Sequence, residues 1–140
     1  SFRDSFQNRR CVVPASGFYE WKSTDSGKTP YYVYPEDEDC FAFAGVWDRW
    51  TDESGERSLM TFSILTRSPN RTMERIHDRM PLLLGEEERE RWLDPELTDR
   101  DELKAITENT YAADRMNLHP VTTRVNNPEY DNEDCIKSSS

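Results

Sequence analysis

Short β-prone runs separated by polar turns fill the first half of the chain, and they constrain the fold more than any other feature. The runs are rich in β-branched and aromatic residues, and the turns between them carry glycine, proline, serine or acidic residues. The expected strands cover residues 10–13, 18–22, 30–34, 41–47 and 59–66, with a last one at 118–125. Such a succession predicts an antiparallel sheet. We therefore expect an α+β protein, with a mostly antiparallel curled sheet or barrel-like core on which a few short helices pack.

A short helix is expected directly after the strand that ends near residue 66. Ser68 and Pro69 are typical of an N-cap followed by proline at the first helical position. Met73 and Ile76, three residues apart, would form the apolar face of this helix. Pro81 forces the residue before it into an extended conformation, so the helix must end earlier.

Further regular elements are expected beyond that proline. Residues 82–84 form an apolar run that is too short and continuous for a half-exposed strand, so a buried strand is expected there. Residues 86–93 are expected to form a helix, because acidic residues fill its first turn. Residue 98 or 99 would cap another helix. Its inner face is expected to carry Leu103, Ile106 and Tyr111.

Basic residues recur at every fourth position of one segment: Arg67, Arg71, Arg75 and Arg79. Where the segment is helical, this spacing places them on nearly one face. The row is then either a solvated surface, with Glu74 and Asp78 as ion-pair partners, or a contact for an anion such as phosphate. The spacing leaves both interpretations open.

Two side chains capable of acid–base chemistry stand at unusual places. Glu20 lies among aromatic residues in the run FYEW, where its carboxylate either points to solvent or is half-buried. A half-buried carboxylate is a candidate acid or base. His77 is expected at the end of the short helix, flanked by Asp78 and Arg79. A lone histidine is more often structural than catalytic, so the residues alone leave its role open.

The charge balance bears on habitat and partners. The 140 residues include 28 acidic and 18 basic side chains, which gives a formal net charge of −10, and only four of the basic residues are lysines. An acid-rich, lysine-poor surface stays hydrated in concentrated salt, so we expect either a salt-adapted source or an ordinary acidic protein. A polyanion would meet the least repulsion near the early strands and the arginine row. No apolar run approaches the roughly 20 residues that span a bilayer, and no signal peptide is recognisable, so we expect a cytoplasmic protein without membrane contact.

Three cysteines, Cys11, Cys40 and Cys135, stand far apart in the sequence. They form no C-x-x-C pair, and only two histidines accompany them, so the spacing does not fit a zinc site. We expect no metal and no cofactor. Each cysteine is expected to act as a small buried or half-buried hydrophobic residue in a reducing compartment.

Three segments carry a resemblance to a known family. They are RRCVVPASGFYEW (residues 9–21), IHDRMP (76–81) and HPVTTRVNNP (119–128). In this order and with these spacings they resemble the SOS-response-associated peptidase (SRAP) family, which includes abasic-site sensors of bacteria, archaea and eukaryotes. The resemblance runs from about Arg9 to Cys135. It implies a single SRAP-like domain over residues 1–140.

The resemblance implies a DNA-damage response protein that recognises abasic sites in single-stranded DNA and links to them covalently. In the family, the nucleophile is a cysteine at the mature N-terminus. Its α-amine condenses with the ring-opened sugar aldehyde, and its thiol then closes a thiazolidine. Glu20 matches the glutamate of the GFYEW-type motif and would orient or deprotonate the nucleophile. His77 matches the histidine of the HDRMP-type motif and would transfer protons during sugar opening and Schiff-base formation.

The same resemblance implies DNA contacts. Trp21, Thr66 and Arg79 match family positions that contact the strand by stacking or by phosphate hydrogen bonds. Arg71 of the arginine row is expected to add a further contact. The implied partner is therefore single-stranded DNA containing abasic sites, bound by a protein that is nucleoid-associated and monomeric when full length.

The sequence departs from the family at its start. It begins at Ser1, and the family's N-terminal segment, with its cysteine and an Asn-x-Arg motif, is not in it. None of the three cysteines can replace the missing nucleophile, because an internal cysteine has no free α-amine. We therefore expect these 140 residues alone to be inactive in crosslinking. Whether the parent is an enzyme stays open, since the family name implies a peptidase or hydrolase whereas abasic-site chemistry is lyase-like.

Two alternatives to the crosslinking function stay open as well. One is a thiol autopeptidase that removes its own leader. The other is a non-catalytic module that holds single strands through Trp21 and the arginine row, with Glu20 and His77 as structural residues.

Overall fold

The computed structural model describes residues 7–109 and 111–139. The chain forms two compact units, each built from three separate stretches. The first unit comprises Ser1–Pro14, Ala42–Arg67 and Pro81–Tyr111, and the second comprises Ala15–Phe41, Ser68–Met80 and Ala112–Ser140. Each unit is described by itself below.

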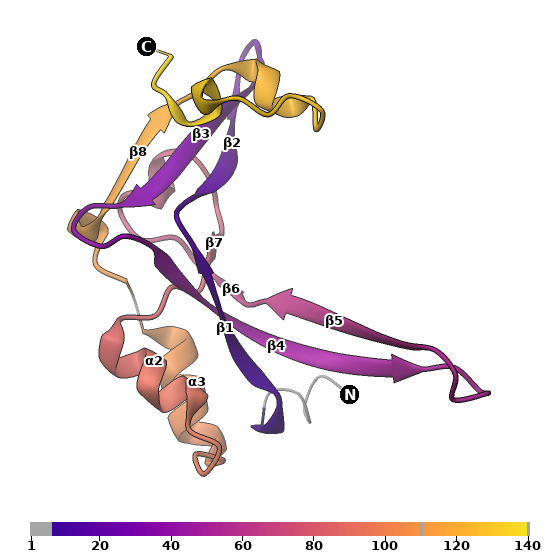
Figure 1. Cartoon of the computed structure of the whole chain (residues 1–140). Helices are drawn as coiled ribbons and strands as arrows, with labels where there is room; N and C mark the ends of the chain where they lie inside the picture. Colours follow the sequence, from indigo (N-terminus) through magenta and orange to yellow (C-terminus); the bar gives the residue numbers. More distant parts are fainter. Residues whose placement is uncertain (1–6, 110, 140) are drawn as a thin grey trace. The chain divides into compact units, whose positions relative to one another are not determined.

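The first unit is organised around a three-stranded sheet in the order β1-β4-β5. These strands are β1 (Arg10–Ala15), β4 (Phe41–Thr51) and β5 (Ser58–Ile64). β4 and β5 are antiparallel, with Gly45 opposite Ile64 and Thr51 opposite Ser58. In Figure 1 they form a long hairpin that continues as a two-stranded ribbon past β1. Two short strands, β6 (Thr66–Arg67) and β7 (Met80–Pro81), form a separate two-stranded ribbon.

The core of this unit lies between β4, the segment after β7, and two helices. Its buried members are Ala42, Ala44, Val46, Leu82, Leu84, Trp92, Leu103 and Ile106. The apolar run 82–84 is buried as expected, but it does not form the expected strand, because Leu83 makes only an isolated β-bridge to Phe43. Bonds from Ala44 N–H to the Leu82 carbonyl and from Leu84 N–H to the Ala42 carbonyl, both 2.9 Å, hold the run against β4. Burying this apolar surface supplies the main stabilisation of the unit.

The two helices of the first unit follow the expected pattern closely. α2 (Glu86–Leu93) and α3 (Arg100–Glu108) lie side by side in Figure 1. Of the two expected caps, the structure uses Asp99, whose side chain accepts bonds from the backbone N–H groups of Asp101 and Glu102. Tyr111 is buried as expected, although it lies beyond the end of α3.

The second unit contains the other three-stranded sheet, in the order β2-β3-β8. Its strands are β2 (Phe18–Thr24), β3 (Gly27–Pro35) and β8 (Met116–Pro120), paired antiparallel throughout. Three 3-10 helices accompany the C-terminal part, at Ala113–Arg115, Thr123–Asn126 and Glu133–Ile136. The predicted strand at 118–125 is therefore wrong in its bounds. The chain turns after β8 because the Thr122 side chain caps the following 3-10 helix by accepting a bond from the Arg124 N–H.

The predicted helix after Ser68 is also wrong. Only a single 3-10 turn, η1 (Met73–Arg75), forms in this segment, and its N-cap is Thr72. The arginine row consequently has no helix to align it, so its four members do not share a helical face. Met73 and Ile76 are nevertheless buried, as the apolar spacing indicated.

The α+β class and the mostly antiparallel pairing are confirmed. In the described part of the chain the strands form separate sheets and no closed barrel. No helix within the described residues is long and apolar enough to cross a membrane. Cys11 and Cys135 are half-buried as expected, but Cys40 is exposed, because it lies in the polar turn before β4 and not within a strand.

Candidate acid–base site

The segment that carries His77 is fixed by one buried side chain, Asn70. Its carboxamide oxygen accepts a bond from the Met73 N–H at 3.0 Å, and its amide nitrogen contacts the sulfur of Met116 at 3.1 Å. Its own backbone N–H points at the sulfur of Met80, 3.2 Å away. The carbonyl of Met73 then accepts the N–H of His77 at 2.9 Å. A chain of tertiary contacts, and not helix propensity, therefore positions the histidine.

Glu20 and His77 lie against each other in the second unit. Glu20 stands on β2, opposite Tyr31 of β3, and the register of that pair fixes its place on the sheet. Its Oε1 lies 3.5 Å from Nε2 of His77, and the two side chains are 23% and 36% exposed. Of the two readings left open by the sequence, Glu20 thus fits the half-buried one. The pair is accessible and partly desolvated, as proton-transferring groups at a surface site need to be.

The two ring nitrogens of His77 have different neighbours. The N–H of Arg79 donates to Nδ1 at 3.1 Å, and a backbone amide cannot act as an acceptor. This bond favours the neutral form that carries its proton on Nε2, which faces Glu20. When the ring is protonated, Nδ1–H can instead donate to the Asp78 carboxylate, 3.3 Å away, or to the Arg79 carbonyl at 3.2 Å. The imidazole thus has a carboxylate near each ring nitrogen, Glu20 at Nε2 and Asp78 at Nδ1.

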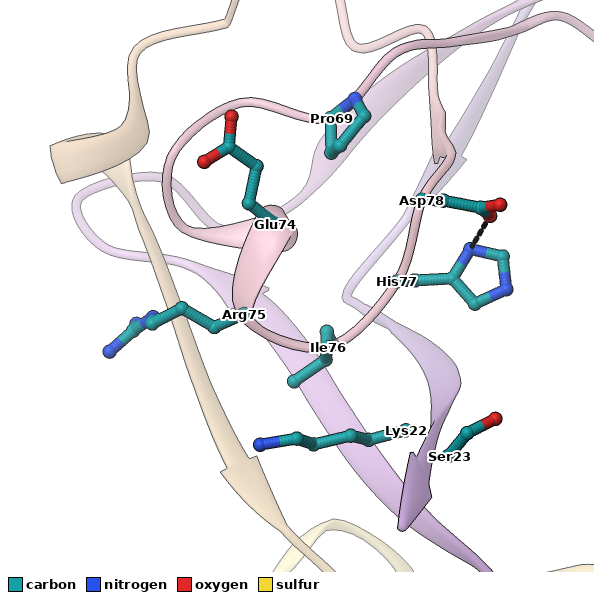
Figure 2. Close-up of a pocket in the computed structure, with 8 residues that line it drawn as sticks. All are labelled: Lys22, Ser23, Pro69, Glu74, Arg75, Ile76, His77 and Asp78. Carbon is teal, nitrogen blue, oxygen red and sulfur yellow. Dashed lines mark ion pairs between the residues drawn. The ribbon is translucent and has the colours of Figure 1, made fainter.

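A shallow hollow of about 690 Å³ opens beside the imidazole. His77, Asp78, Lys22, Ser23, Glu74 and Arg75 are among the residues that line it. Figure 2 shows the His77 and Asp78 side chains on one side of the hollow, whereas the Lys22 and Arg75 side chains extend toward the other. The hollow therefore offers an acid–base group on one side and two cationic groups on the other.

The remaining predicted site residues lie at different places. Trp21 follows Glu20 on β2, is half-buried, and donates from its indole nitrogen to Asn126 Oδ1 at 2.8 Å. Arg79 is exposed and lies two residues after His77 in the sequence. Arg71 is exposed and lines a second hollow, of about 450 Å³, with Thr72, Glu74 and Arg75. Thr66 is exposed on β6 and belongs to the first unit, whereas the other five belong to the second.

Sequence reasoning missed two residues that shape the site. The spacing indicates Asp78 as an ion-pair partner of the arginine row, but its carboxylate lies 3.3 Å from Nδ1 of His77. The sequence pattern indicates no role for Asn70, although its side chain anchors the turn. The available indication of its role was its position directly after Pro69, because an asparagine in a turn often hydrogen-bonds to backbone groups two or three residues later.

The fold and the site together define an α+β protein that presents a carboxylate–imidazole pair at the edge of an open hollow. The chain belongs to the SOS response associated peptidase (SRAP) family, whose sequence model matches residues 1–128.

Two individual proteins show sequence similarity to this chain over nearly its whole length. The abasic site processing protein YoqW of Bacillus subtilis is 40% identical over 139 residues, which cover 99% of this chain and 61% of YoqW. The abasic site processing protein HMCES of Xenopus tropicalis is 35% identical over 150 residues, covering 94% of this chain and 44% of that protein. The chain thus spans about three fifths or less of these relatives.

Solved structures show the same fold. A crystal structure of a protein from Bacteroides thetaiotaomicron superimposes with a TM-score of 0.91 at 31% identity, and the match covers 100% of this chain and 61% of that one. A phage-related protein from Bordetella bronchiseptica matches with a TM-score of 0.66 at 30% identity, over 86% of this chain and 56% of that one.

Proposed function

We propose that this chain carries the acid–base half of an abasic-site processing site, in a parent protein that forms a thiazolidine crosslink with abasic sites in single-stranded DNA. The observation that carries the proposal is the 3.5 Å approach of Glu20 Oε1 to His77 Nε2 beside an open hollow. The relatives named abasic site processing proteins support the substrate class. The nucleophile of the parent is an N-terminal cysteine that the present sequence does not include.

In the proposed reaction, an α-amine attacks the C1 aldehyde of the ring-opened sugar. Opening the sugar requires a proton on the ring oxygen, and loss of water from the carbinolamine requires a proton on the departing hydroxyl. In each step Glu20 takes the proton that leaves, from the C1 hydroxyl during opening and from the nitrogen during attack and dehydration. The protonated imidazole of His77 gives one proton from Nε2 to the ring oxygen or to the departing hydroxyl. Glu20 then returns its proton to Nε2 across the 3.5 Å pair, which restores both groups for the next step. The thiol then adds to the Schiff-base carbon and closes the ring, and its proton passes to the nitrogen.

The DNA strand is proposed to run over exposed groups of this chain. Arg79 and Arg71 are exposed and offer guanidinium groups for phosphate oxygens, and Trp21 offers an aromatic surface for a base. Thr66 is proposed to add a phosphate hydrogen bond. We propose a monomeric, nucleoid-associated parent protein for which this chain forms a single SRAP-like domain with the N-terminal segment. Peptidase activity on its own leader is the alternative assignment for the same residues.

The test uses this chain joined to the N-terminal segment of YoqW, with an abasic single-stranded oligonucleotide as substrate. The SDS-stable adduct is quantified over time. Glu20→Gln and His77→Gln should each slow its formation by about 10²–10⁴-fold while leaving binding to the undamaged strand intact. Glu53→Gln, in an exposed turn of the first unit, is the matched control and should change neither readout. Unchanged adduct formation in both variants would assign the pair a structural role.

The unfused chain provides a second arm of the test. It should form no SDS-stable adduct, because none of its three cysteines has a free α-amine. Recovery of an adduct from the 140 residues alone would refute the proposed nucleophile.

A further inference from the structure

The arginine row is divided between different roles. Arg67 donates from its guanidinium to the Glu108 carbonyl at 2.8 Å, at the end of α3. It therefore caps a helix whose last turn holds no basic residue. Arg75 instead lines two hollows, the larger one beside His77 and the smaller one that it shares with Arg71. The row is thus not one surface, and Arg75 is a member that borders the acid–base pair.

A second cation reaches the larger hollow from the strand that carries Glu20. Lys22 lies two residues after Glu20 on β2, and alternation along a strand places both side chains on the same face of the sheet. Arg75 lies two residues before His77. Figure 2 shows the Lys22 and Arg75 side chains extending toward the same side of the hollow. Each segment of the acid–base pair therefore also contributes one cation to the hollow.

Neither cation is neutralised by a carboxylate in the described part of the chain. The ion pairs that form among the described residues use other cations, and none of them includes Lys22 or Arg75. Arg75 makes one long contact, from Nε to the Thr72 carbonyl at 3.4 Å. Glu74 also lines the hollow, but its side chain extends away from Arg75 in Figure 2. Two like charges that face one hollow repel each other, and a bound anion removes that repulsion.

The chemistry and the shape of the hollow favour the phosphodiester of a strand over a small free anion. A guanidinium presents a planar fork of N–H donors that fits two phosphate oxygens, and an ammonium adds a point charge. The hollow is open, so a strand can enter and leave it along the surface. Because a β-strand rises about 3.3 Å per residue, the Cα atoms of Glu20 and Lys22 lie about 6.6 Å apart. One nucleotide can therefore place its sugar at the acid–base pair and its own phosphate at the two cations.

We propose that Lys22 and Arg75 bind the phosphodiester that is attached to the abasic sugar itself. This inference rests on the proposed function and adds the groups that orient the reacting nucleotide. Lys22 and Arg75 take no part in proton transfer. They hold the sugar beside Glu20 and His77 through its phosphate. The charge of one particular phosphate, next to the damaged sugar, should therefore govern binding more than the charge of the other phosphates.

The test measures binding without chemistry, so that its failure is distinct from failure of the acid–base proposal. The 140-residue chain is titrated into a fluorescent single-stranded oligonucleotide that carries one tetrahydrofuran residue, an abasic analogue with no aldehyde to react. Affinity is measured by anisotropy over a range of salt concentrations. Lys22→Gln and Arg75→Gln should each weaken binding about tenfold and lower the slope of log K against log salt by about 0.7.

Matched variants control for the loss of one positive charge. Lys104→Gln and Arg100→Gln remove the same charges from exposed positions of α3 and should change neither the affinity nor the slope. Lys22→Arg keeps the charge and should retain most of the binding, which separates lost charge from a disturbed strand.

Methylphosphonate linkages, which remove the charge of one phosphate at a time, identify the phosphate that is bound. A methylphosphonate that adjoins the tetrahydrofuran residue should weaken binding to the unaltered chain. It should have no further effect on the double variant Lys22→Gln/Arg75→Gln, because the partners of that phosphate are already removed.

Several results would overturn the inference. They are no binding by the unaltered chain, unchanged binding in Lys22→Gln and Arg75→Gln, an equal loss in the two α3 controls, and no selective effect of the adjoining linkage. Competition by inorganic phosphate at constant ionic strength would also overturn it, because the pair would then hold a free ion. If the expected binding results are obtained but the adduct assay of Glu20→Gln and His77→Gln fails, the phosphate site stands and the proposed chemistry does not.

Discussion

The backbone N–H of Arg79 donates to Nδ1 of His77 over 3.1 Å, and this bond favours the neutral imidazole that carries its proton on Nε2, beside Glu20. We predict that ¹⁵N NMR of the neutral ring shows the Nε2–H tautomer as the dominant form. Free histidine in water also favours this tautomer, so the diagnostic variant is Arg79→Pro, which removes the N–H donor and should increase the Nδ1–H fraction. Arg79→Gln keeps the backbone donor and should leave the tautomer unchanged. A dominant Nδ1–H signal in the unaltered chain would contradict this assignment.

Asn70 should be more important for stability than its polar character suggests. Asn70→Ala leaves the buried Met73 N–H without its acceptor at 3.0 Å. The expected loss in free energy of unfolding is about 1–3 kcal/mol, measured by urea denaturation. Glu74→Ala, which changes an exposed residue of the same segment, is the comparison. If the two variants were equally stable, Asn70 would not be the residue that holds this turn.

Tyr19 should make the second unit sensitive to alkaline pH. Its hydroxyl donates to the Cys135 carbonyl at 3.1 Å. Burial, together with nearby Cys135, Tyr32 and Asp131, raises the pKa of Tyr19 above its ordinary value. Because the pKa of Tyr19 is higher in the folded than in the unfolded state, its hydroxyl contributes fully to stability below the unfolded pKa of about 10. That contribution is lost as the pH rises through the folded pKa.

The corresponding measurement is the free energy of unfolding as a function of pH. Tyr19→Phe should lower the free energy of unfolding by about 1 kcal/mol at neutral pH. Above about pH 10, this free energy should decline less in Tyr19→Phe than in the unaltered chain. Tyr31→Phe, on the neighbouring strand, controls for the loss of a tyrosine hydroxyl. Identical alkaline profiles for the unaltered chain and Tyr19→Phe would show that this hydroxyl does not couple to folding.

The cysteines should differ in reactivity. Cys40 is exposed, whereas Cys11 is half-buried and burial raises the pKa of its thiol. Because the thiolate is the reactive form, iodoacetamide should label Cys40 before Cys11 at neutral pH. Labelling of Cys11 should reach half of its maximal rate at a higher pH than that of an ordinary thiol. Site-resolved mass spectrometry measures both rates, and faster labelling of Cys11 at pH 7 would be the contrary outcome.

The strands were largely predictable because alternation is a local property of the sequence. The run FYEW shows period-two alternation in its own residues, and it forms part of β2. The helix capped by Asp99 was predictable for the same reason, since its cap and its apolar face lie within one segment. The segment after Ser68 was not, because the contacts of Asn70 with Met80 and Met116 join residues that lie far apart in the sequence. Those contacts override a local helix signal.

The sequence by itself determined the antiparallel α+β class, the position of most strands, and, through its motifs, the family. The tertiary structure alone decided that the carboxylate of Glu20 meets the imidazole of His77, and which nitrogen of that ring faces it. It also decided that β5 is exposed on both faces. The physical reason is that secondary structure and motifs depend on residues that are close in the sequence, whereas the distance between two side chains depends on strand register and on how separate segments pack.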